Sequence, residues 1–222
     1  MFYFKLCCIA QTLSLVGYYE PIITMEDRML KNILFFGDSL TAGYGLLNVS
    51  IESLPALIQA KVKADSLPYH VINAGVSGET SAGGLARIDL LINKSIDVFV
   101  LELGANDILR GIPPQTTASN LQAIINKIKA KHPQAKMALL GMELPEWIPG
   151  AFAGAFRAVF KQVAQANQMA FVPFLLDGVA GVAHLNLRDG LHPTAAGYQI
   201  IANKVWPVLR PLLINVDKST ER

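Results

Sequence analysis

From Lys31 onward, short apolar runs alternate with longer segments in which apolar residues recur every three or four positions. Short runs of this kind are typical of buried parallel strands, and the longer period is typical of amphipathic helices. The predicted strands are Ile33–Phe36, Tyr69–Ile72, Asp97–Leu101, Lys136–Leu140 and Ala170–Val172. Five strands that alternate with five helices predict a three-layer α/β/α sandwich around a parallel sheet.

Each predicted helix carries an apolar stripe that can cover one face of this sheet. The first three stripes are Ile51, Leu54, Ile58 and Val62; Leu85, Ile88, Leu91 and Ile92; and Leu121, Ile124, Ile125 and Ile128. A fourth helix is expected from about Gly150 to Asn167. The fifth begins near Pro193 and Thr194, where proline suits the first turn of a helix.

The length and composition fit one folded domain. The chain has 222 residues, of which 52% are hydrophobic and 16% are charged. That length suits a single α/β domain, and the low charge content excludes a disordered chain. We expect the domain to span residues 31–214, after an N-terminal extension (1–30) and before a polar tail (215–222).

The extension has one early cation, Lys5, followed by uncharged residues from Leu6 to Tyr19. This stretch is too short and too polar for a stable membrane span, which needs about 20 apolar residues. It is either a secretory signal or sequence upstream of a true start at Met25 or Met29. The first interpretation predicts a periplasmic or secreted protein, and the second a cytoplasmic one.

Charge and cysteine content argue against a nucleic-acid partner, a disulfide framework and a cysteine-based metal site. The formal net charge is +2, and the lysine and arginine residues are scattered, so nucleic acid is not expected as a partner. Cys7 and Cys8 are the two cysteines and lie near the start, so the rest of the chain holds neither a disulfide framework nor a cysteine-based metal site. No feature of the sequence specifies an oligomeric state.

Open parallel sheets bind ligands at the carboxyl ends of their strands, so chemistry is expected in the loops that follow the predicted strands. Ser39 follows the first strand within the motif GDSLTAGYG, and Asn106 follows the third within ELGANDILRG. Asp189 precedes His192 by three residues in RDGLHP. A turn of this length can bring the carboxylate to Nδ1 of the imidazole while Nε2 faces outward, as a general base requires.

Each of these features alone also fits a structural role. Asp-x-x-His occurs in structural turns, and asparagine after glycine is common in turns. A serine hydroxyl, a base, an acid and hydrogen-bond donors at one sheet edge together favour nucleophilic catalysis. The oxyanion hole would then contain the side-chain amide of Asn106 and the backbone N–H groups of Ser39 and Gly75.

Four blocks occur in order along the chain: GDSL at 37–40, Gly75, GAND at 104–107 and DGLH at 189–192. In order and character they resemble the four blocks of the SGNH, or GDSL, hydrolases over nearly the whole chain. The resemblance implies Ser39 as nucleophile, His192 as base and Asp189 as its orienting acid. It also implies a flavodoxin-like sheet with strand order 2-1-3-4-5. A serine activated in this way needs no metal or other cofactor.

Three longer stretches, KNILFFGDSLTAGYGL, NAGVSGETSAGGLARI and LGMELP, look like the bacterial branch that contains acyl-CoA thioesterases, lysophospholipases and arylesterases. The resemblance implies a small-molecule acyl ester or thioester substrate, hydrolysed through an acyl-Ser39 intermediate. Large apolar residues in the loops are the candidates for the acyl pocket, namely Ile108, Leu109, Leu144 and Ile148.

Three alternatives compete with this interpretation. A carbohydrate O-acetylesterase could use the same scaffold, although only Trp147 and Tyr44 are obvious aromatic groups for a sugar site. A nucleotide-binding or flavin-binding protein would need a phosphate loop, but no Gly-Lys-Ser/Thr follows the first glycine-rich loop. His184, Asp189 and His192 are suitable metal-ligand types, but they lack the helical His-x-x-x-His spacing.

Overall fold

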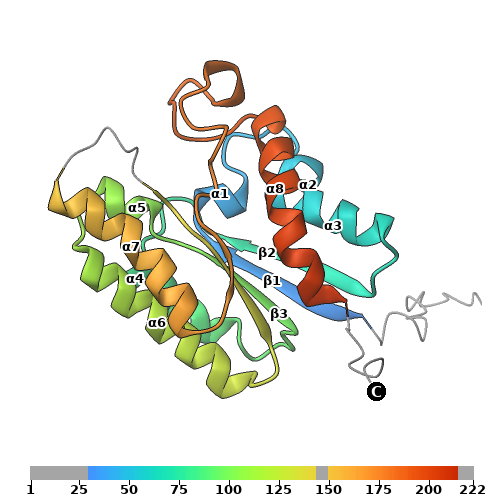
Figure 1. Cartoon of the computed structure of the whole chain (residues 1–222). Coiled ribbons are helices and arrows are strands. Elements are labelled where there is room, and N and C mark those ends of the chain that lie inside the picture. Colours follow the sequence, from blue (N-terminus) through green and yellow to red (C-terminus); the bar gives the residue numbers. More distant parts are fainter. Residues whose placement is uncertain (1–29, 144–149, 215–222) are drawn as a thin grey trace, which may run out of the picture.

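Five parallel strands form a sheet in the order β2-β1-β3-β4-β5 (Figure 1). The structure, a computed structural model, describes residues 30–143 and 150–214. The strands are β1 (Lys31–Gly37), β2 (Tyr69–Gly75), β3 (Val98–Glu102), β4 (Lys136–Leu140) and β5 (Ala170–Val172). The predicted strand order is therefore confirmed.

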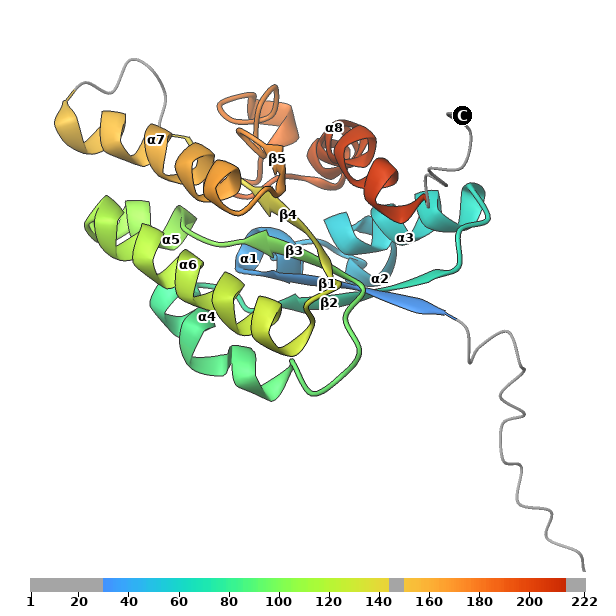
Figure 2. The ribbon, with the colours of Figure 1, turned by 60° about the horizontal axis from the view of Figure 1, so that its bottom comes forward.

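Helices cover both faces of the sheet and confirm the predicted three-layer architecture (Figure 2). On one face lie α3 (Leu54–Ala64) and α8 (Ala195–Leu213), which pack against each other. On the other face lie α4 (Ser81–Arg87), α6 (Pro114–Lys131) and α7 (Ala151–Ala166). Short helical turns lie between these elements: α1 (Ser39–Ala42), α2 (Val49–Glu52), η2 (Ile88–Leu90), α5 (Ala105–Leu109) and η3 (Ala183–Leu185).

The first two predicted helices are each interrupted. Ile51 belongs to the separate turn α2 and is exposed, because Ser53 has an extended backbone and starts a new helix. The Ser53 side chain accepts the N–H of Ala56 and so caps α3. The second stripe is divided because α4 passes into η2, after which Leu91 and Ile92 follow in a turn.

The central strands β1 and β3 are the most buried part of the sheet. Every residue of β3, and every residue of β1 from Ile33 onward, is buried. Phe35, Phe36 and Phe99 are buried completely, and each such side chain stabilises the fold by about 1.5–3 kcal/mol. Strands covered by helices on both faces need such continuous apolar runs. The two strands therefore give the loops at their carboxyl ends a rigid support.

The register brings the ends of three strands to one level. Gly37 of β1 is paired with Gly75 of β2 and with Glu102 of β3. The turn α1 packs directly on the end of β2. The approach is so close that a Cβ atom on Gly75 would lie 2.2 Å from the backbone nitrogen of Ala42. Glycine is the residue that permits this approach. The loops after β1, β2 and β3 consequently leave the sheet side by side.

Several predictions fall on parts of the chain outside the described residues. These are most of the N-terminal extension (1–29), the tail (215–222), and Leu144 and Ile148 of the predicted acyl pocket. Within the described residues, the helices are too short or too polar to cross a membrane.

Candidate active site

Ser39 is the first residue of α1 and follows β1 by one residue. Asp38 caps this helix, since its Oδ1 accepts the N–H of Leu40 at 3.0 Å. Gly43 ends the helix with φ of 83°, a left-handed conformation that glycine adopts without strain. The turn therefore fixes the Ser39 side chain at the edge of the sheet. Its backbone N–H, in the first turn, has no acceptor within the helix.

His192 reaches Ser39 from the loop before α8. Its Nε2 lies 2.9 Å from Ser39 Oγ, and its Nδ1 lies 2.7 Å from Asp189 Oδ2. The other oxygen, Asp189 Oδ1, accepts the backbone N–H groups of Leu191 at 2.9 Å and His192 at 3.0 Å. Gly190 turns the loop with φ of 70°. The structure thus joins the predicted serine, histidine and acid in one chain of hydrogen bonds.

The protonation of this chain follows from its contacts. Hydrogen bonds from the backbone N–H and the ring of His192 lower the pKa of Asp189 to about 2. Asp189 is therefore a carboxylate at neutral pH and accepts the Nδ1–H of the imidazole. In that tautomer Nε2 is unprotonated and can take a proton from Ser39. The ring of Tyr44 packs against the imidazole with centroids 4.6 Å apart, which helps to hold the ring in place.

Asn106 lies on α5, after β3, and contacts Asp38. Its Nδ2 donates to Asp38 Oδ2 at 3.0 Å. A side-chain amide has two N–H donors, so this hydrogen bond orients the amide and leaves the second hydrogen for another acceptor. Asn106 and Ser39 line the same pocket. The arrangement suits donation to an oxyanion that develops next to Ser39.

Gly75, the third predicted oxyanion donor, is the last residue of β2. Its backbone N–H donates to Oδ1 of Asn73 at 3.0 Å, so this N–H already has an acceptor. The close approach of Ala42 explains why glycine is needed at this position. Gly75 therefore has a packing role at the end of β2, and its part in an oxyanion hole with Ser39 and Asn106 stays a prediction.

Two carboxyl groups lie behind the site, and neither is among the predicted site residues. Asp38 and Glu102 are both completely buried. Glu102 Oε2 accepts the backbone N–H of Asp38 at 3.2 Å and the hydroxyl of Thr41 at 2.8 Å. Burial raises the pKa of Asp38 to about 6 and raises the pKa of Glu102 well above its usual range. The feature of the sequence that could have pointed to this pair is Glu102 itself, an acid directly after the apolar run of β3.

Two arginine side chains hold the loops after β2 and β3 at this edge of the sheet. Arg87 forms a two-pronged ion pair with Glu79, with N–O distances of 2.5 to 2.8 Å, and donates to the carbonyl of Ala74 at 2.8 Å. Arg110, which follows α5, donates to the carbonyl of Gly78 at 2.8 Å. These contacts link the loop after β2 to α4 and to the loop after β3.

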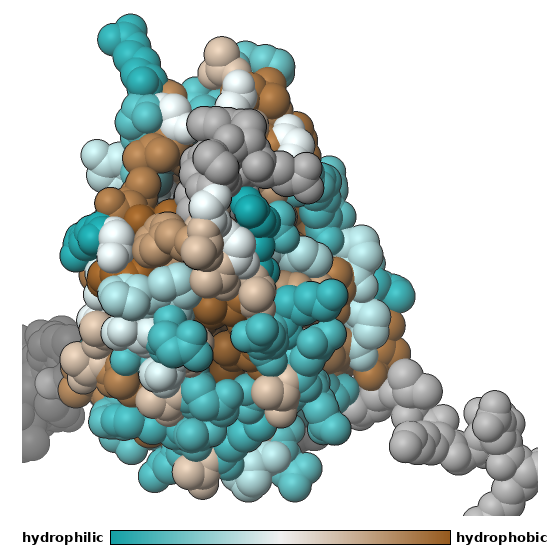
Figure 3. Space-filling model, turned by 60° about the vertical axis from the view of Figure 1, so that its left-hand side comes forward, coloured by the Kyte–Doolittle hydropathy of each residue, from teal (hydrophilic) through white to brown (hydrophobic). Residues whose placement is uncertain are grey.

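A pocket of about 430 Å³ opens beside Ser39 and His192. Two of the predicted acyl-binding residues, Ile108 and Leu109, line it. Further wall residues, which were not predicted, include Met142, Glu143, Phe174, Leu176, Ala180 and Leu191. Most of these lie in the loops after β4 and β5, where ligands of open parallel sheets are expected. On the side of the molecule where α5 and α7 lie, patches of apolar side chains (brown) occur among polar ones (Figure 3).

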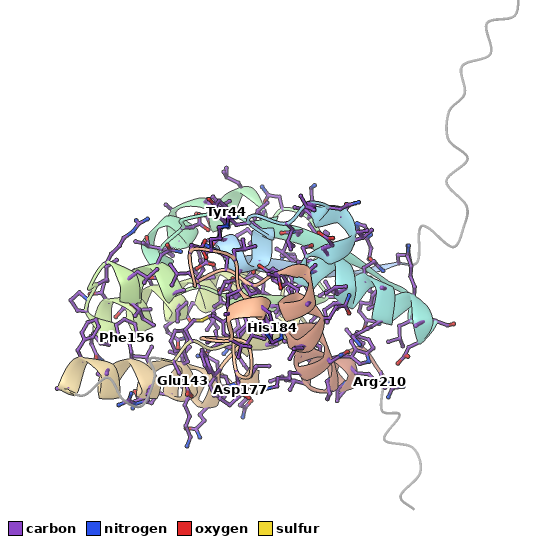
Figure 4. All side chains as sticks on the ribbon, turned by 90° about the horizontal axis from the view of Figure 1, so that it is seen from above. Tyr44, Glu143, Phe156, Asp177, His184 and Arg210 are labelled. Atoms are coloured by element: carbon purple, nitrogen blue, oxygen red, sulfur yellow. The ribbon has the colours of Figure 1, made fainter. Side chains whose placement is uncertain are left out.

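The geometry gives no support to the alternative metal site. Both ring nitrogens of His192 already face side chains, Ser39 and Asp189. His184 lies on η3 near α8, and its backbone carbonyl accepts the hydroxyl of Thr194 at 3.3 Å (Figure 4). Within residues 30–143 and 150–214, no three or more His, Cys, Asp or Glu side chains are grouped so that they could hold a metal ion.

Comparison with known proteins agrees with this geometry. The model of the GDSL-like lipase/acylhydrolase family matches residues 35–200. Esterase TesA of Pseudomonas aeruginosa is 37% identical over 204 residues, which cover 91% of this chain and 100% of that protein. Thioesterase 1/protease 1/lysophospholipase L1 of Escherichia coli K12 is 32% identical over 193 residues, covering 86% of this chain and 89% of that protein.

Solved structures show the same relationship. A crystal structure of TesA superposes with a TM-score of 0.77 at 40% identity and covers 82% of this chain and 100% of that one. The psychrotrophic esterase EstA from Pseudoalteromonas sp., solved in a form inhibited by monoethylphosphonate, gives a TM-score of 0.74 at 32% identity, covering 82% and 98% of the two chains. The chain therefore belongs to the GDSL-like lipase/acylhydrolase family, as its motifs implied, and is an ester hydrolase.

Proposed function

We propose that this protein hydrolyses acyl esters and thioesters through a covalent acyl intermediate on Ser39. The observation that carries the proposal is the chain of hydrogen bonds from Ser39 through His192 to Asp189, beside an apolar pocket. A serine hydroxyl needs an adjacent, oriented base to act as a nucleophile, and this chain supplies one.

In the acylation step, Ser39 Oγ attacks the carbonyl carbon of the substrate while His192 Nε2 accepts the hydroxyl proton. The hydrogen bond from Nδ1–H to Asp189 stabilises the imidazolium that forms. Asn106 Nδ2 and the backbone N–H of Ser39 donate to the carbonyl oxygen as it becomes negative. His192 then gives the proton to the leaving oxygen or sulfur as its bond to the carbonyl carbon breaks, which leaves acyl-Ser39.

Deacylation repeats these steps with water in place of Ser39. His192 accepts a proton from the water as its oxygen attacks the acyl carbon, and the same donors bind the second oxyanion. The bond to Ser39 Oγ then breaks, His192 returns the proton to Oγ, and the carboxylic acid leaves. The substrate and one water molecule are the reactants that balance the two steps.

The pocket walls favour an acyl chain as the recognised part of the substrate. Ile108, Leu109 and Phe174 are apolar and line the same pocket as Ser39. The relatives carry the names esterase, arylesterase and thioesterase 1/protease 1/lysophospholipase L1. These names cover different leaving groups, which supports a site that selects the acyl group more strongly than the alcohol or thiol.

A substrate panel tests the proposal. The purified full-length protein is assayed with aryl esters of increasing acyl length, acyl-CoA thioesters, lysophospholipids and acetylated xylan, with Ser39→Ala as the control. We expect a higher kcat/KM for medium-chain acyl esters or thioesters than for acetylated xylan, and loss of all these activities in Ser39→Ala. A preference for acetylated xylan would instead identify a carbohydrate O-acetylesterase.

A further inference from the structure

The buried carboxyl pair lies one contact away from the reacting atoms. Asp38 Oδ2 accepts the amide of Asn106, a candidate oxyanion donor. Glu102 lies behind Asp38, where its Oε2 accepts the backbone N–H of Asp38 and the hydroxyl of Thr41. Its second oxygen, Oε1, is buried and has no hydrogen-bond partner among the described residues. Glu102 takes no part in the acylation and deacylation steps.

An unpartnered, buried carboxylate oxygen conflicts with an ionised side chain. A carboxylate offers acceptors only, and burying one without donors is strongly unfavourable. Asp107, another completely buried acid, shows the contrast, since its two oxygens accept the backbone N–H and hydroxyl of Ser81 and the hydroxyl of Thr117. Glu102 Oε1 accepts nothing, so an ionised Glu102 would carry buried charge on an oxygen without a donor, and a protonated, neutral carboxyl group avoids that cost.

The hydrogen bonds that Asp38 and Glu102 accept indicate which of the two acids holds the proton. Both oxygens of Asp38 already accept N–H groups, from Leu40 and Asn106. Two acids this close in a buried site cannot both be ionised without strong repulsion. Burial raises the pKa of both acids, but each oxygen of Asp38 accepts an N–H group, whereas Oε1 of Glu102 accepts none. The proton therefore belongs to Glu102.

The other titratable groups around the pair are compatible with one negative charge. Tyr198 of α8 donates its hydroxyl to the carbonyl of Leu40. Burial, and after it the charges of Glu102 and Asp38, raise the pKa of Tyr198, so its hydroxyl stays neutral. The charge of His192 lowers the pKa of Asp38. A protonated His192, formed during each proton transfer, thus favours the ionised form of Asp38.

We propose that Glu102 is a protonated carboxylic acid in the working enzyme, and that it keeps a single negative charge on Asp38, which in turn orients the Asn106 amide toward the oxyanion. Glu102 is thus a positioning residue that acts through Asp38 and touches no substrate. This inference rests on the proposed function, because it assumes that Asn106 stabilises an oxyanion at Ser39.

Two near-isosteric substitutions separate the roles of the two acids. Glu102→Gln keeps an acceptor for Asp38 N–H and Thr41 and a donor in place of the protonated oxygen, so kcat should stay close to that of the wild type. Asp38→Asn must place an N–H₂ group toward either Asn106 or the N–H of Leu40, so one donor loses its acceptor. Since misplacing a catalytic group by about 1 Å can cost about 10²-fold, we expect kcat to fall about 10²-fold with little change in KM.

An infrared measurement reads the proton on Glu102 without using activity. A protonated carboxylic acid has a C=O stretching band that a carboxylate lacks, and labelling glutamate with ¹³C shifts it. We expect such a band at neutral pH in the wild type and in Ser39→Ala, and its loss in Glu102→Gln. Asp107→Asn is the matched control, a substitution at a buried acid that accepts three hydrogen bonds, and should leave the band in place.

The results that would overturn this inference differ from those that would overturn the proposed function. Absence of the shifted band at neutral pH, or a folded Glu102→Gln protein whose kcat falls as far as that of Asp38→Asn, would overturn the inference. If Ser39→Ala keeps wild-type activity, the proposed function fails, whereas the infrared band still reports on Glu102. A wild-type pH profile of kcat in Glu102→Gln, together with the missing band, would support the inference.

Discussion

Replacing Asn106 by alanine should affect catalysis and folding together, because its amide faces both the pocket and a buried acid. Removing one preorganised oxyanion donor lowers kcat by about 10²–10³-fold, or about 2.7–4 kcal/mol of transition-state stabilisation. KM should change much less, since the donor acts mainly on the transition state. The same substitution removes the donor to Oδ2 of Asp38, which is completely buried.

Leaving a buried acceptor unsatisfied costs about 1–3 kcal/mol of folding free energy. For a domain of this size that corresponds to a decrease in Tm of about 2–12 °C. The assay is steady-state hydrolysis of a chromogenic aryl ester together with a thermal melt. Asn120→Ala is the matched control, since Asn120 donates to the hydroxyl of Ser81 at 2.9 Å and does not line the pocket; its kcat should match the wild type. An unchanged kcat in Asn106→Ala, or a rise in KM alone, would refute the assignment.

Three further predictions concern the acid and the pocket. Asp189→Asn removes the carboxylate that selects the tautomer of His192, so kcat should fall on the order of 10⁴-fold, and full activity at pH 7 would contradict the assignment. The pKa of Asp189 is lowered from 3.8 to about 2 in the folded protein, so its stabilising effect should be present above about pH 4 and be lost as the pH falls toward 2. The Tm values of wild type and Asp189→Asn should therefore converge in that range, and a constant difference between them would count against the prediction. Ile108→Trp should fill part of the pocket and shift the kcat/KM optimum to shorter acyl chains; an unchanged optimum would remove Ile108 from the acyl site.

The strands could be predicted from sequence because their burial on both faces requires continuous apolar runs. The predicted strand Asp97–Leu101 corresponds to β3, Val98–Glu102. The order of the strands in the sheet was predicted from the family resemblance. The helix boundaries were harder to predict. The break between α2 and α3 depends on the extended backbone of Ser53, and a stripe of apolar residues contains no information on such a cap.

The catalytic candidates could be predicted because their geometry is local or set by the sheet. Ser39 follows the first strand, and Asp189 and His192 are three residues apart in one turn. The contact between the N–H of Gly75 and Asn73 could not be predicted, because it depends on how the Asn73 side chain is oriented. Glu102 was missed because an acid after a strand is usually solvated, and only the register shows that it ends beside Gly37 and beneath α1.

Covalent labelling of Ser39 tests the central claim most directly. The full-length protein is treated with a fluorophosphonate, digested, and the modified peptide is identified by mass spectrometry. We predict one adduct, on Ser39, whose appearance parallels the loss of esterase activity, and no adduct in Ser39→Ala, whose kcat should be lower by roughly 10³-fold or more. An adduct on a different residue that accounts for the loss of activity, or a folded Ser39→Ala protein with wild-type activity, would contradict the account.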